Sequence, residues 1–66
     1  MPLDFVVKVG RLYTIWEMTA KQMYARLNAD PALIDRLDQA PFKTRTEAEK
    51  RRDELNAGSR ARAAHN

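Results

Sequence analysis

Few residues of this chain belong to the types that carry enzymatic chemistry. The 66 residues include no cysteine, and the only histidine is His65. A catalytic nucleophile needs a base positioned beside it, and a phosphate-binding loop needs a run of glycines, whereas this chain has only Gly10 and Gly58. We therefore expect a protein that is not an enzyme and that uses no cofactor, no metal ion and no small-molecule substrate.

Acidic side chains gather at residues 35–38 and 47–54. At helical spacing, such groups usually form solvated faces. Glu47 also has two basic neighbours in positions to form ion pairs, Lys50 and Arg51, three and four residues further on. We interpret these acids as structural rather than catalytic.

Basic side chains are concentrated toward the C-terminus. Residues 1–40 carry five basic and five acidic side chains, so the whole net charge of +3 belongs to residues 41–66. The residues that could contact phosphate are Lys43, Arg45, Lys50, Arg51, Arg52, Arg60 and Arg62. Such a surface would bind nucleic acid with little sequence preference and a strong dependence on salt. The alternative interpretation is a solvated helix face on which acids and bases form ion pairs.

The elements that must position these residues begin with a β-hairpin over residues 3–18. Gly10-Arg11 separates two runs rich in β-branched and aromatic residues, as in a two-residue hairpin turn. This turn fixes the register, so that Val9 is opposite Leu12 and Phe5 is opposite Trp16. One side of the ribbon is then almost wholly apolar and predicts the core.

The other side of the hairpin has a mixed character. It includes Val6, Lys8, Tyr13 and Ile15, and Val6 should lie directly opposite Ile15. If the helices cover only the apolar side, these four residues face water in a monomer. We expect them, with the open strand edges, to bind a protein partner or a second copy of the chain. The alternative is a tolerated exposed pair of strand-forming residues.

Two short helices should follow the hairpin. Thr19 is a good N-cap for a helix over 20–28, with apolar residues at helical spacing. Asp30 followed by proline predicts a second helix of about nine residues, with its apolar side formed by Leu33, Ile34 and Leu37. The spacing of the two helices is also that of a DNA-binding helix-turn-helix. We reject this interpretation because the second helix, which would enter the major groove, has more acidic than basic side chains.

A third helix should begin near Thr44, whose spacing to Glu47 is that of a capping box, with Thr46 and Glu49 as the alternative pair. Gly58 predicts its end after Ala57. The predicted fold class is therefore α+β, an N-terminal β-hairpin with two or three short helices packed on one side of it (ββααα). We expect a single domain over 1–58 and a disordered basic tail over 59–66.

The sequence also bears on location and partners. No signal-peptide pattern and no long apolar run is present, so we expect a cytoplasmic protein without a membrane-spanning segment. A chain of this size buries a small core, which favours self-association. The predicted function is a small non-enzymatic interaction module that binds a protein partner or forms a homodimer. The alternative is a nucleic-acid-binding accessory protein.

Overall fold

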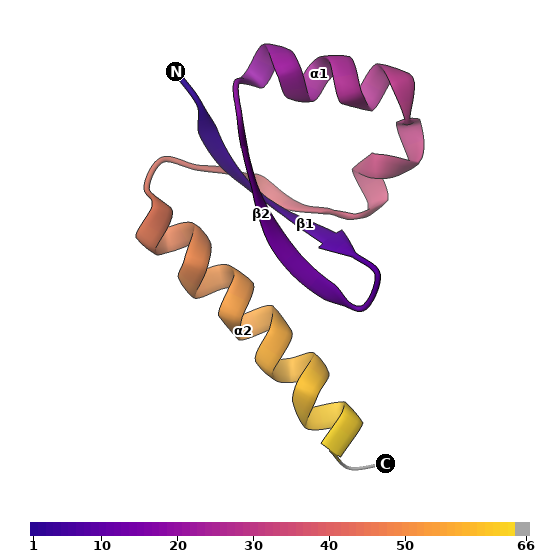
Figure 1. Cartoon of the computed structure of the whole chain (residues 1–66), viewed down its shortest axis with the longest axis vertical. Helices are drawn as coiled ribbons and strands as arrows, with labels where there is room; N and C mark the ends of the chain where they lie inside the picture. The colour runs from indigo at the N-terminus through magenta and orange to yellow at the C-terminus, as the bar shows by residue number, and fades with distance from the viewer. Residues whose placement is uncertain (65–66) are drawn as a thin grey trace.

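The computed structural model describes residues 1–64, and only the backbone of 39–40 and 59–64 is described. The chain is a mixed α+β domain (Figure 1). Its elements in order are β1 (Leu3–Val9), β2 (Leu12–Met18), α1 (Ala20–Ala29), a 3₁₀ helix η1 (Pro31–Asp35), β3 (Leu37–Phe42) and α2 (Arg45–Ala64). The three strands form one antiparallel sheet in the order β2-β1-β3.

The predicted hairpin is confirmed in both its turn and its register. Val9 pairs with Leu12, Phe5 with Trp16, and Val6 with Ile15. Gly10 has a φ of 67°, in the left-handed region that glycine adopts at little cost. The turn chemistry and the alternation of side chains therefore determine this part of the fold.

The predicted second helix is wrong beyond its first residues. Only Pro31–Asp35 are helical, as one 3₁₀ segment, and Leu37–Phe42 form β3. β3 pairs with the side of β1 that the hairpin leaves open, and the Lys8 backbone N–H donates to the Arg36 carbonyl oxygen at 2.9 Å. Pairing of backbone groups with this open edge outweighs the local preference of a segment with few strand-forming residues.

The helices do not all pack on one side of the hairpin, as was expected from the sequence. α1 and η1 cover the apolar side. There Phe5, Val7, Met18, Met23 and Leu33 form a buried cluster. In Figure 1, α1 lies at one end of the sheet, and α2 runs diagonally from near the end of β3 to the C-terminus. The predicted core side is therefore confirmed, although only part of the helical structure covers it.

The other side of the sheet lies under α2. Asp38 of β3 pairs with Val6 of β1, so their side chains are on the same face, and Arg51 of α2 binds Asp38 on that face. Val6 and Ala48 are both fully buried. α2 covers this face of the sheet, which a hairpin alone would expose, and it does so with small and amphipathic side chains.

The predicted end of the third helix at Gly58 is also wrong. α2 continues through this residue to Ala64. Gly58 has no left-handed φ, and a β-carbon placed there would meet nothing within 4 Å. The segment 59–64, expected to be disordered, has a helical backbone, and residues 65–66 of the predicted tail lie outside the described residues.

Candidate functional site

The four hairpin residues predicted to bind a partner do not form an exposed surface. Val6 has no exposed area, Tyr13 and Ile15 are half-buried, and Lys8 alone is exposed. The prediction that this side faces water in a monomer is wrong because α2 covers it. The sequence of α2 has few apolar residues. The prediction therefore underestimated how much of the sheet this helix covers.

Asn56 attaches α2 to the hairpin and was not recognised in the sequence. Its Oδ1 accepts a hydrogen bond from the Tyr13 backbone N–H at 2.7 Å, and its Nδ2 donates to the Tyr13 carbonyl oxygen at 3.1 Å. Asn56 is only 7% exposed. A single buried amide in a helix whose sequence is otherwise polar gives little signal of a specific partner 43 positions away.

Arg51 is held in a two-point contact with Asp38. Arg51 Nε donates to Asp38 Oδ2 at 2.8 Å, and Nη2 donates to Oδ1 at 3.2 Å. This hydrogen bonding raises the pKa of Arg51 above its ordinary value, against a smaller opposing effect of burial. The fork geometry fits a carboxylate, so the guanidinium group fastens α2 to β3 and is already engaged.

Arg45 and Arg52, two further residues of the predicted phosphate-binding set, also form ion pairs. Arg45 Nη1 lies 3.4 Å from the buried carboxylate of Asp4, and Arg45 Nε lies 3.8 Å from Glu49. Arg52 Nε lies 3.0 Å from Asp53. The acidic partners offset part of the positive charge of these side chains and so weaken the field that they could present to phosphate.

Lys43 and Lys50 of the same set are exposed. Lys50 borders a hollow of about 340 Å³ that Phe42 and Arg51 share with the carboxylates Glu47 and Glu54. This hollow is balanced in charge. The side chains of Arg60 and Arg62 lie outside what the structure describes. A phosphate-binding role for the whole set remains a prediction.

An apolar groove lies on the opposite face, between α1, η1 and β3. Its volume is about 350 Å³. The lining residues are Phe5, Ala20, Met23, Tyr24, Leu27, Ile34, Leu37 and Pro41. Tyr24 is 71% exposed and Ile34 is 57% exposed. Two large apolar side chains thus stand at the opening of a groove whose floor belongs to the core.

Local hydrogen bonds fix the first wall of this groove. The Thr19 hydroxyl accepts from the Gln22 backbone N–H at 3.1 Å, and the Gln22 side chain accepts from the Thr19 N–H at 2.9 Å. This reciprocal arrangement is a capping box. The Thr19 cap predicted from the sequence is therefore confirmed, and it determines where α1 begins.

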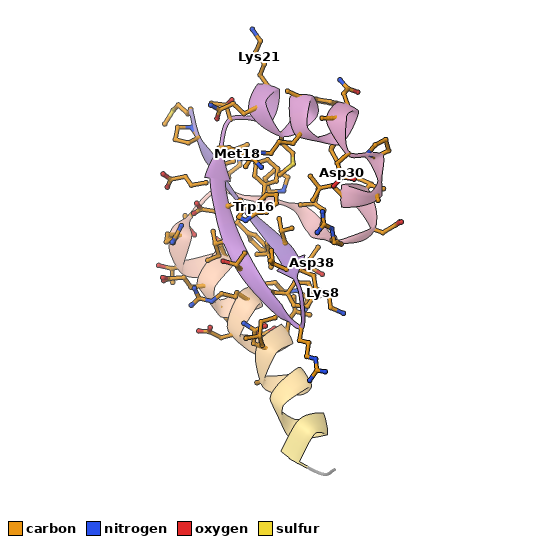
Figure 2. The ribbon with its side chains drawn as sticks, turned by 45° about the vertical axis from the view of Figure 1, so that its right-hand side comes forward. Lys8, Trp16, Met18, Lys21, Asp30 and Asp38 are labelled. Atoms are coloured by element: carbon orange, nitrogen blue, oxygen red, sulfur yellow. The ribbon has the colours of Figure 1, made fainter. Side chains whose placement is uncertain are left out.

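The second wall is fixed by the turn between α1 and η1. The Asp30 backbone N–H donates to the Arg26 carbonyl oxygen at 2.8 Å, and the Asp30 carboxylate accepts from Arg36 at 3.1 Å. Arg26 also lies over the Trp16 ring, 5.1 Å from its centroid. Trp16 packs against the core (Figure 2). The groove is therefore preformed.

The apolar residues of the η1 side of the groove were identifiable from the sequence, but their arrangement was not. The predicted second helix placed Leu33, Ile34 and Leu37 together on one apolar side. In the structure Leu33 is 2% exposed and packs in the core, while Ile34 lines the groove from the surface. The change from a helix to a short 3₁₀ segment and a strand is what separates these side chains.

Metal binding and membrane spanning can both be checked in the described part of the chain. Residues 1–64 contain no group of three or more His, Cys, Asp or Glu side chains that could hold a metal ion. None of their helices has the length and apolar character needed to cross a membrane. In comparisons with known proteins, no family model, no curated protein and no solved structure matches this chain.

Proposed function

We propose that this chain is a small non-enzymatic interaction module whose groove between α1, η1 and β3 binds a short apolar segment of a protein partner. The observation that carries the proposal is the pair of exposed side chains, Tyr24 and Ile34, at the opening of a preformed groove. The absence of cysteine favours a reducing compartment such as the cytoplasm.

The chemistry of the lining favours a protein segment over a small molecule or a nucleic acid. Among the described side chains that line the groove, the Tyr24 hydroxyl is the one polar group, and none of these side chains is charged. Small-molecule sites use a few precisely placed polar groups to orient the ligand, and nucleic acids need cations for their phosphates. Large apolar side chains need neither, so they suit this groove.

The size of the groove limits how tightly such a segment can bind. A volume of about 350 Å³ lies at the lower end of the range of ligand pockets. Full burial of one large apolar side chain contributes about 1.5–3 kcal/mol. One or two such side chains therefore give weak binding alone, and contacts along the rims formed by Tyr24 and Ile34 must contribute the rest.

A peptide selection tests the proposal even though the natural partner is not identified. Random peptides displayed on phage would be selected on the full chain, without any selection against the variant Ile34→Asp. We expect the selected peptides to carry one or two large apolar residues. In ¹H–¹⁵N spectra they should shift the amide signals of Tyr24, Ile34 and Leu37 most strongly.

The matched control is Val9→Asp, which places the same charge on another exposed apolar residue, 48% exposed, at the hairpin turn. Selected peptides should bind this variant as they bind the wild-type chain. Peptides that bind Ile34→Asp equally well, or that shift signals only on α2, would show that the groove is not the binding site.

A further inference from the structure

The outer edge of β2 alternates between peptide groups that face β1 and groups that face away. Lys8 donates its N–H toward β3, so its partner Tyr13 does not exchange hydrogen bonds with it. The Tyr13 peptide groups therefore face outward, where Asn56 binds them. By the two-residue period of a strand, the peptide groups of Ile15 and Glu17 also face outward.

This edge is closed at one position and open at the next two. Among the backbone and side-chain groups that the structure describes, no hydrogen bond from another residue reaches the outward N–H and carbonyl groups of Ile15 and Glu17. Asn56 closes only the Tyr13 position. α2 is anchored to Asp4 of β1 near its start and binds the edge of β2 at Tyr13. The described side chains of α2 therefore bind the edge at Tyr13 and leave the outward peptide groups of Ile15 and Glu17 available, although the Ile15 side chain is half-buried.

We propose that two copies of this chain pair through these edges, β2 against β2, as an antiparallel dimer centred on Trp16. A two-fold axis at Trp16 places Ile15 opposite Glu17 of the second copy. Each of the two resulting pairs exchanges both of its hydrogen bonds. The dimer would have one continuous six-stranded sheet in the order β3-β1-β2-β2-β1-β3.

The register follows from the closed and charged positions. Centring the pair on Ile15 would require the Tyr13 groups that Asn56 already binds. Centring it on Glu17 would place two carboxylates directly opposite each other, which is destabilising. Centring it on Trp16 uses every open group and also brings the two Trp16 rings together as an aromatic pair on the α1 face.

A second copy is the partner that this edge fits best. The open stretch is symmetric about Trp16, so each copy offers the donors and acceptors that the other lacks. β3, at the opposite edge of the sheet, contains Pro41, which lacks an N–H to donate. A short chain with a small core also gains stability from an extended sheet. The groove lies on the β3 side and stays accessible in this dimer.

Disulfide cross-linking of the full chain tests the register directly, because the native chain has no cysteine. Hydrogen-bonded antiparallel partners have Cα atoms about 5.5 Å apart, within the disulfide range. An equimolar mixture of the variants Ile15→Cys and Glu17→Cys should form a disulfide-linked heterodimer. Each variant alone should cross-link much more slowly. Equally fast self-cross-linking of Glu17→Cys would overturn the proposed register.

Sedimentation equilibrium provides the second measurement. Glu17→Pro removes an outward N–H at an exposed position without removing a hydrogen bond to β1. We expect it to raise the dimer dissociation constant at least about tenfold, while Glu17→Ala leaves that constant nearly unchanged. A wild-type chain that stays monomeric up to about millimolar concentration would overturn the proposal. Ile34→Asp should leave the dimer intact, so failure of the dimer and failure of the groove are distinguishable.

Discussion

The side-chain amide of Asn56 binds both backbone polar groups of Tyr13, as the peptide group of a neighbouring strand would. This contact joins α2 to the outer edge of the sheet. It satisfies one position of an edge strand and leaves the next outward positions open. The packing of α2, the burial of Val6 and the available dimer register all depend on where this amide lies.

Removal of the Asn56 amide should destabilise the fold. Asn56→Ala leaves the partly buried Tyr13 peptide groups without these partners, so we expect the free energy of unfolding to fall by about 1–3 kcal/mol in urea titrations. Glu54→Ala, at an exposed position of the same helix, should change it by less than about 0.5 kcal/mol. Equal effects of the two substitutions would mean that the amide does not anchor α2.

Val6 should behave as a core residue and not as a binding residue. Val6→Thr places a hydroxyl in a site with no exposed area, and we expect it to lower the free energy of unfolding by about 1–3 kcal/mol. Lys8→Thr, exposed on the same strand, is the matched control and should be nearly neutral. A neutral Val6→Thr would contradict the position of α2 over this face.

The two glycines should respond in opposite directions to alanine. Gly58 lies within α2 in open space, so Gly58→Ala should raise the free energy of unfolding by about 0.5–1 kcal/mol and increase the helical circular dichroism signal. Gly10 has a φ of 67°, so Gly10→Ala should be destabilising. A destabilising Gly58→Ala would instead support a helix that ends at this residue.

Two neighbouring basic residues on α2, Lys50 and Arg51, should differ in how much they contribute to the stability of the fold. Arg51→Ala removes both hydrogen bonds to Asp38, and we expect a lower midpoint of urea unfolding. Lys50→Ala, at an exposed position, should leave the midpoint unchanged.

A titration of fluorescent duplex DNA at two salt concentrations tests the nucleic-acid alternative. Tight binding at low salt that weakens at moderate salt, and that Lys50→Ala reduces, would support that alternative.

The hairpin and the start of α1 were predictable because local rules determine them. A glycine at the turn sets the register from Val9 to Phe5, and a hydroxyl before a helical pattern sets the N-cap. These signals do not depend on distant residues, and both are confirmed. The core side of the sheet followed directly from the register.

The third strand and the packing of α2 could not be predicted in this way, because they depend on contacts between distant segments. β3 forms because β1 has an open edge, although the sequence of residues 37–42 has little strand character. The cover of the second face depends on Asn56 and Arg51 finding Tyr13 and Asp38. Such pairings have no local periodicity, so the sequence could not show that Val6 would be buried or that Ile34 would be exposed.

The most direct test of the proposed function is the affinity of a selected peptide for three forms of the chain. We predict that Ile34→Asp weakens binding at least about tenfold, a change of about 1.4 kcal/mol. The carboxylate at the groove would lose hydration when the peptide binds, which costs free energy. Val9→Asp should bind as the wild-type chain does. Equal affinities for all three forms, measured on folded proteins, would contradict a binding site in this groove.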